Sequence, residues 1–118
     1  MPLQCLIVDD YQPFLKVARA NLERQGVAVV GEATNGAEAL RRARELRPDV
    51  ALVDISLGPE SGFDVAWEIS PHVGSVIMIS SSDRYAEDDY AQLIASNPAV
   101  GFLSKATLSA EAISQLVP

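Results

Sequence analysis

Short, continuous apolar runs recur along the chain, separated by stretches with helical periodicity. Each run is rich in valine, isoleucine or leucine and does not alternate regularly with polar residues, which is typical of a strand covered on both faces. The predicted strands are Leu3–Val8, Val27–Val30, Val50–Val53, Val76–Ile79 and Val100–Leu103. The sequence therefore predicts a sheet that is buried between layers of helices.

The segments between these runs carry apolar residues at helical spacing. In the first segment, Phe14, Ala18 and Leu22 share one face. Pro13 suits the first turn of this helix, and Gly26 suits the position just past its end. Further helices are predicted around Leu40–Leu46, Phe63–Ile69, Ala86–Ser96 and Leu108–Val117.

The regular alternation of strand and helix indicates an α/β fold with a parallel sheet. Right-handed crossovers leave few topologies, and a common one is flavodoxin-like: a (βα)5 three-layer sandwich whose five-stranded parallel sheet has the order 2-1-3-4-5. We predict this arrangement. We also expect residues 1–118 to form one domain with no second domain in this chain, because 118 residues suffice for a single core.

Composition narrows the class of partner. The chain has 9 basic and 16 acidic residues, a net charge of −7, which argues against direct binding of nucleic acid or an anionic membrane by this domain. The single cysteine, Cys5, lies in an apolar run and suggests a buried thiol in a reducing compartment. No run is long enough to span a membrane, and the N-terminus does not resemble a signal peptide. We therefore expect a cytoplasmic protein.

Polar residues gather where the predicted strands end. Because the carboxyl ends of parallel strands lie along one edge, where ligands bind, we expect these residues to form one cluster. They are Asp9 and Asp10 after the first strand, Asp54 after the third, Ser80 after the fourth, and Ser104 and Lys105 after the fifth.

The acidic residues of this cluster predict a metal site. If the first and third strands are neighbours, their ends lie ~5 Å apart. Three carboxylates at that separation repel one another, and a hard divalent cation removes the conflict. Mg²⁺ prefers oxygen ligands, so we assign it to Asp9, Asp10 and Asp54, together with the backbone carbonyl of Ser56.

The remaining residues of the cluster suggest phosphoryl chemistry. Aspartate is a known nucleophile that forms an aspartyl-phosphate, and we assign this role to Asp54. Lys105 and Mg²⁺ would spread the charge of the phosphoryl group, and the Ser80 hydroxyl would bind one of its oxygens.

Four motifs in this order give the whole chain a resemblance to the receiver domain of bacterial two-component response regulators. They are "LIVDD" (6–10), "PDVALVDISL" (48–57) with Gly62, "VIMISSS" (76–82) and "GFLSK" (101–105). The opening and "EATNGAEAL" (32–40) look most like receivers that precede helix-turn-helix DNA-binding domains. The resemblance implies a phosphoacceptor at Asp54, a direct metal ligand at Asp10, a second acid at Asp9 acting through water, and the family's invariant lysine at Lys105.

The resemblance also implies partners and a switch. Such domains accept a phosphoryl group from a sensor histidine kinase or a phosphotransfer protein, and their only catalysis is their own phosphorylation and dephosphorylation. Phosphorylation adds roughly two negative charges. If Ser80 moves inward to meet them, Phe102 can enter the vacated space and reshape the face of helix 4, strand 5 and helix 5. That face would contact an output domain, a partner protein or a second copy in a homodimer.

The chain departs from the family pattern in two loops. Gly58 stands where the family often has proline, with Pro59 following it, so we expect a looser loop. Ser81 and Ser82 follow the switch hydroxyl, and with Ser56 we assign them to tuning the phosphate lifetime.

Two other functions stay open. One is a protein-interaction module that keeps the fold and works without phosphorylation. The other is a phosphotransferase or phosphatase acting on small molecules, which usually needs an acid two residues after the nucleophile. Ser56 occupies that position, which disfavours the second alternative.

Overall fold

The computed structural model describes residues 2–81 and 95–118. Its main sheet has five parallel strands in the order β2-β1-β3-β6-β7. The strands are β1 (Gln4–Val8), β2 (Ala28–Ala33), β3 (Val50–Asp54), β6 (Ser75–Ser80) and β7 (Gly101–Ser104). Two short strands, β4 (Ser56–Leu57) and β5 (Glu60–Ser61), form a separate antiparallel hairpin. Without this hairpin the order along the chain is 2-1-3-4-5, so the predicted topology is confirmed.

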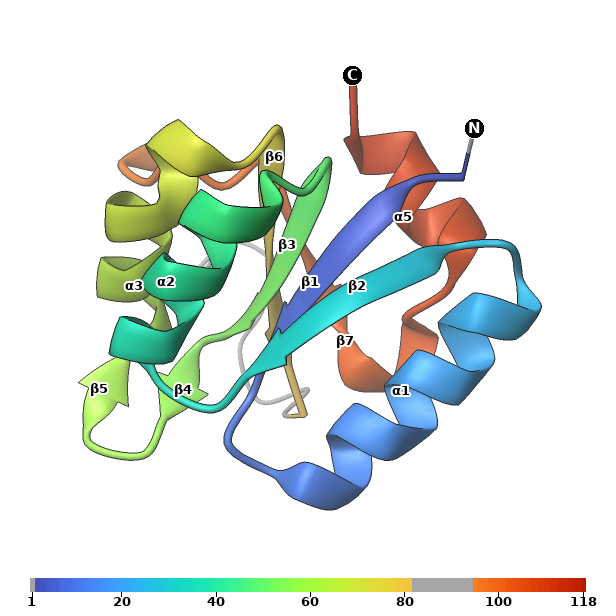
Figure 1. Cartoon of the computed structure of the whole chain (residues 1–118), viewed down its shortest axis with the longest axis horizontal. Helices are drawn as coiled ribbons and strands as arrows, with labels where there is room; N and C mark the ends of the chain where they lie inside the picture. The colour runs from blue at the N-terminus through green and yellow to red at the C-terminus, as the bar shows by residue number, and fades with distance from the viewer. Residues whose placement is uncertain (1, 82–94) are drawn as a thin grey trace.

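Helices cover both faces of the sheet (Figure 1). The helices are α1 (Gln12–Arg24), α2 (Gly36–Leu46), α3 (Gly62–Ile69) and α5 (Ala110–Leu116), with short 3₁₀ turns at Ser70–His72 and Lys105–Thr107. One apolar cluster joins the sheet to α2 and α3, and a second joins it to α1 and α5. The predicted helix Ala86–Ser96 lies almost entirely outside the described residues.

The continuous apolar runs are buried as the pattern predicts. All five residues of β3 and all six of β6 are buried, because helices close both faces of the sheet. Within residues 2–81 and 95–118, no helix is long and apolar enough to cross a membrane.

The last helix begins later than the prediction of Leu108–Val117. The Ser109 backbone is extended, and its hydroxyl accepts a hydrogen bond from the amide of Ala112, so Ser109 is the N-cap. Before the helix, Lys105–Thr107 forms a 3₁₀ turn, which keeps Lys105 next to the end of β7.

Candidate functional site

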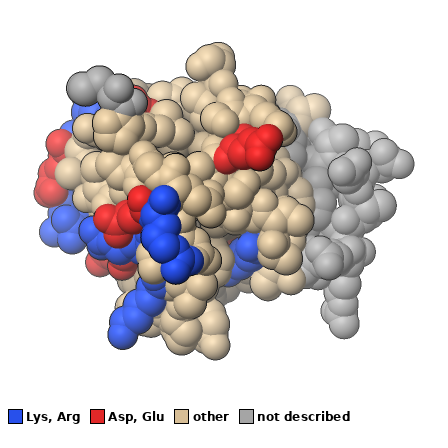
Figure 2. Space-filling model, turned by 90° about the vertical axis from the view of Figure 1, so that its right-hand side faces the viewer, with Lys and Arg blue, Asp and Glu red and all other residues tan. Residues whose placement is uncertain are grey.

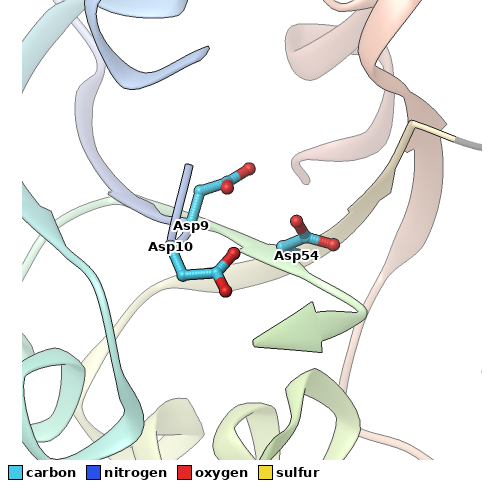
Figure 3. Close-up of side chains that lie close together, drawn as sticks. All are labelled: Asp9, Asp10 and Asp54. Atoms are coloured by element: carbon cyan, nitrogen blue, oxygen red, sulfur yellow. The ribbon is translucent and has the colours of Figure 1, made fainter. Parts of the chain in front are cut away.

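Three carboxylates meet at the carboxyl edge of the sheet. Val8 pairs with Val53, so the ends of β1 and β3 lie side by side. One oxygen from each of Asp9, Asp10 and Asp54 lies within 4.8 Å of the others. Figure 3 shows the three side chains around a common space at the ends of their strands. The predicted acidic cluster therefore forms, with Asp9 and Asp54 buried and Asp10 exposed.

Backbone amides hold the two buried carboxylates in place. The Tyr11 amide donates to Asp9 Oδ1 at 2.8 Å, and the Ser56 amide donates to Asp54 Oδ1 at 3.0 Å. Each carboxylate thus accepts from an amide two residues further along the chain, where the chain leaves the strand. This local bond fixes the direction of the other oxygen.

Lys105 connects the two buried acids across the sheet. Its Nζ lies 2.5 Å from Asp9 Oδ2 and 3.0 Å from Asp54 Oδ2, although the lysine follows β7, two strands away from β3. The lysine side chain is 13% exposed. The cluster combines three carboxylates with this one ammonium, which contacts two of them, so negative charge is in excess.

The protonation of this group follows from burial and pairing together. Burial raises the pKa of Asp9, and the hydrogen bonds from Lys105 and Tyr11 only partly offset it, while the charge of Asp54 raises it further. Burial alone would lower the pKa of Lys105. Its hydrogen bonds and attraction to Asp9 and Asp54 outweigh that effect, so the pKa of Lys105 is raised and the ammonium stays charged.

The cluster fits a hard divalent cation. Its donors are carboxylate oxygens from two adjacent strand ends, and the negative charge that Lys105 leaves uncompensated favours a cation. Asp9, Asp10 and Asp54 would hold Mg²⁺, with the Ser56 backbone close by in β4.

The predicted switch residues lie on one face of adjacent strands. Ser80 is buried at the end of β6 and pairs with Ser104 of β7. Phe102 lies two residues before Ser104, so its side chain is on the same side of the sheet as Ser80. Phe102 is partly buried and packs against the apolar cluster under α2 and α3. Ser81 is exposed just after β6, and Ser82 lies outside the described residues.

The loop after Asp54 is more structured than its sequence suggests. Gly58 has φ +63°, which proline cannot adopt, and its Cα faces Asp10 closely enough that a Cβ would be 3.5 Å from Asp10 Oδ2. The Gly62 amide donates to the Ile55 carbonyl, and a Cβ at residue 62 would lie 1.8 Å from the Asp54 carbonyl oxygen. The Gly62 hydrogen bond closes the loop onto the end of β3, while the looser loop expected from the missing proline stays a prediction.

Two further residues at this edge were not identified from sequence. The Glu60 carboxylate accepts a hydrogen bond of 3.0 Å from the Gly36 amide, so it joins the β4–β5 hairpin to the start of α2. The Lys105 ammonium lies 4.3 Å from the centre of the Phe14 ring. The helical pattern identifies Phe14 only as an apolar residue of α1, and nothing local to Glu60 indicates its distant partner.

Comparisons with known proteins agree with this geometry. The family model described as "Response regulator receiver domain" matches residues 5–117. The transcriptional regulatory protein LiaR of Bacillus subtilis is 30% identical over 112 residues, covering 92% of this chain and 52% of LiaR. The chemotaxis protein CheY of Thermotoga maritima is 38% identical over 69 residues, 58% of each chain.

Solved structures give the same result. The signal receiver domain of a modulated diguanylate cyclase from Desulfovibrio desulfuricans G20 has a TM-score of 0.79 and 32% identity, covering 98% of this chain and 90% of that one. The structure of the signal receiver domain described as that of the response regulator NarL from Mycobacterium tuberculosis has a TM-score of 0.76 and 31% identity. It covers 91% of this chain and 86% of that one.

This chain belongs to the response regulator receiver domain family of two-component signalling proteins. Receiver domains generally bind Mg²⁺ at an acidic pocket, and the described residues include such a group of aspartates. The chain spans about half the length of relatives such as LiaR, at 52%, so what those whole proteins do is a separate question.

Proposed function

We propose that this chain is a phosphorylation-dependent switch in which Asp54 accepts a phosphoryl group from a phosphohistidine donor. The observation that carries the proposal is the contact of the Lys105 ammonium with both Asp9 and Asp54 within a cluster of three carboxylates. A charged lysine beside a buried, amide-held aspartate is suited to binding the oxygens of a phosphoryl group on that aspartate.

The residues have separate roles in the transfer. An Asp54 oxygen attacks the donor phosphorus, the phosphorus–nitrogen bond breaks, and the donor imidazole leaves and takes up a proton. Lys105 neutralises the phosphoryl oxygens while the Ser56 amide keeps the carboxylate oriented. Mg²⁺, when bound, supplies further neutralisation. Water later attacks the phosphorus and releases phosphate, and Ser56, Ser81 and Ser82 tune the lifetime of the phosphorylated state.

The switch acts through β6 and β7. Ser80 binds a phosphoryl oxygen and moves inward, and Phe102 follows into the space that the serine leaves. Their location on one side of adjacent strands supports this coupling. The movement changes the surface formed by β7, α5 and the segment before β7, which meets an output domain, a partner protein or a second copy of the chain.

The donor is a sensor histidine kinase or a phosphotransfer protein. Its histidine must reach Asp54, so the partner has to cover the surface beside the edge of the sheet. A groove of ≈ 270 Å³ between α1 and the turn that precedes α5 adjoins this edge and includes Lys105 with the apolar residues Phe14, Val17 and Leu108. Figure 2 shows that uncharged residues dominate this side of the molecule, which suits a protein partner better than a nucleic acid.

We further propose a cytoplasmic protein that acts in transcription regulation. LiaR carries the name of a transcriptional regulatory protein, which supports this direction. CheY is named a chemotaxis protein, so the fold alone does not select the output. Open reading frame analysis for a helix-turn-helix segment tests this part of the proposal.

The phosphoacceptor is tested with fluoroberyllate, which mimics an aspartate-bound phosphoryl group. Amide spectra of the wild-type chain are expected to change on adding fluoroberyllate, only with Mg²⁺, and most strongly around residues 80 and 101–105. Asp54→Ala should abolish the response. Asp49→Ala is the matched control, because Asp49 bonds the Gln4 amide at the opposite edge of the sheet, and it should respond like the wild type.

A second measurement follows the covalent product. Mass spectrometry after incubation with acetyl phosphate should show one added phosphoryl group on the wild type and on Asp49→Ala, but none on Asp54→Ala. If the wild type neither binds fluoroberyllate nor gains mass, the proposal fails and the alternative of a phosphorylation-independent interaction module is supported.

A further inference from the structure

We propose that Phe14 is a positioning residue for Lys105, holding the ammonium over its ring so that it stays directed at Asp9 and Asp54. The contact itself is independent of the proposed function. Its consequence for phosphoryl transfer rests on that function.

Within the described part of the chain, the ammonium has three neighbours of two kinds. Two are the carboxylates of Asp9 and Asp54, at 2.5 Å and 3.0 Å from Nζ. The third is the ring of Phe14, whose centre lies 4.3 Å from Nζ. The face of an aromatic ring carries partial negative charge and attracts a cation within about 6 Å of its centre. The ring therefore stabilises the ammonium without adding another full charge to a cluster that already contains three carboxylates.

The fold fixes the ring relative to the acids. The Tyr11 amide bonds Asp9 Oδ1, and the Phe14 amide bonds the Tyr11 carbonyl at 3.1 Å. A short chain of hydrogen bonds thus leads from Asp9 into the first turn of α1, where Phe14 lies. The ring also packs against the apolar cluster between the sheet, α1 and α5, which limits its movement.

Lysine needs such support because its stem is long. Four methylene groups give the side chain many rotamers, and each productive contact requires that most of them be lost. The ring borders the ammonium on the side of α1, where the groove next to Lys105 opens to solvent. A ring in this position restricts the lysine and limits the access of water to it.

A purely structural role for Phe14 is the competing explanation. An aromatic side chain in the first turn of a helix usually contributes packing alone. The two explanations differ in what they require of the ring. Packing depends on its shape, whereas attraction to a cation depends on the charge distribution of its face.

The first test examines the unphosphorylated chain. Protons above an aromatic ring are shifted upfield, so the NMR signals of the Lys105 ε-methylene and ammonium should lie upfield of ordinary lysine values. Phe14→Leu should return them to those values, and Phe14→Tyr should keep them. Ala20→Ser, at an exposed site on the same helix outside the groove, should not move them. Ordinary Lys105 shifts in the wild type would overturn the inference, whatever the protein does with phosphoryl donors.

The second test changes the ring's charge at nearly constant shape. Phe14 is replaced by phenylalanines carrying one, two and three ring fluorines, which progressively weaken the negative face. The rate of phosphorylation by acetyl phosphate should fall stepwise, by roughly twofold to fivefold in total, and by a similar factor in Phe14→Leu. Thermal unfolding of each variant shows that the fold is retained.

The outcomes separate the two proposals. A rate that does not change along the fluorinated series, in proteins of unchanged stability, rejects the positioning role and leaves packing. A wild-type chain that accepts no phosphoryl group rejects the proposed function, while the Lys105 signals still decide whether the ring holds the ammonium.

Discussion

The middle of the sheet and its carboxyl edge bury different chemistry along the same strands. In the middle, β1, β3 and β6 carry Cys5, Leu52 and Ile77, which are fully buried. A few residues later β1 and β3 lead to Asp9 and Asp54, which are 0% and 7% exposed. Burial is therefore similar in the two regions, and the difference lies in what surrounds each polar group.

Among residues 2–81 and 95–118, no charged group compensates the buried Cys5 thiol. Its Sγ donates a weak hydrogen bond to the Leu6 carbonyl at 3.8 Å, and burial raises the pKa of the thiol to about 12. Asp9 and Asp54 instead receive backbone amides and share the Lys105 ammonium. The comparison shows that buried charge is kept here by compensation from neighbouring backbone amides and from the distant Lys105, while a buried group without compensation stays neutral.

The largest expected effect on stability comes from ionising the Cys5 thiol at high pH. A thiol whose folded pKa is raised contributes stability below its unfolded value of 9.0, and this is lost as pH rises from 9.0 to about 12. The loss is at most about 4 kcal/mol in the free energy of unfolding. Urea denaturation across this range should give a steeper decline for the wild type than for Cys5→Ala.

Lys105 also titrates in alkali, and the Cys5→Ala control accounts for it. The pKa of Lys105 is raised, so its stabilising contribution is likewise lost as pH rises through its folded value, above 10.5. Both proteins retain Lys105, and their difference isolates the thiol. Parallel declines in the two proteins would show that Cys5 is not shielded as its burial indicates.

The next largest expected effect comes from removing the Lys105 ammonium, which compensates the charge of the acids at the carboxyl edge of the sheet. Lys105→Met leaves Asp9 and Asp54 facing each other without their ammonium, and we expect a loss of about 2 kcal/mol at pH 7. Mg²⁺ should restore more stability to this variant than to the wild type, because the cation replaces the lost charge. Lys16→Met, an exposed lysine of α1, should change little in urea denaturation with or without Mg²⁺.

The smallest expected effect on stability comes from loosening the β4–β5 hairpin that borders the acidic cluster. Glu60→Ala removes the acceptor of the Gly36 amide and should lower the free energy of unfolding by about 1 kcal/mol. Glu60→Gln keeps an acceptor oxygen and should lose less. Hydrogen exchange of the Gly36 amide reads the contact directly, and unchanged protection in Glu60→Ala would mean that the carboxylate does not hold the hairpin.

Much of the fold was predictable because its signals are local. The aliphatic runs gave β1, β3, β6 and β7 to within a few residues, and β2 extends three residues beyond the predicted Val30. The β4–β5 hairpin was expected only as a loop. Two-residue strands have too few side chains to produce a periodic pattern, so their pairing is set by contacts within the folded loop.

The sequence by itself determined the strand order and the group of residues at the carboxyl edge. Apolar runs and caps act through neighbouring residues, and the handedness of crossovers then leaves few ways to assemble them. Asp9, Asp54 and Lys105 could be placed at one edge on that basis alone.

Only the tertiary structure decided which atoms compensate one another there. The ring of Phe14 contacts the ammonium of Lys105, which lies 91 positions later in the chain. The Glu60 carboxylate accepts a hydrogen bond from the Gly36 amide, 24 positions earlier. Such contacts depend on helix position and side-chain direction at the ångström scale, which no local pattern of apolar and polar residues encodes.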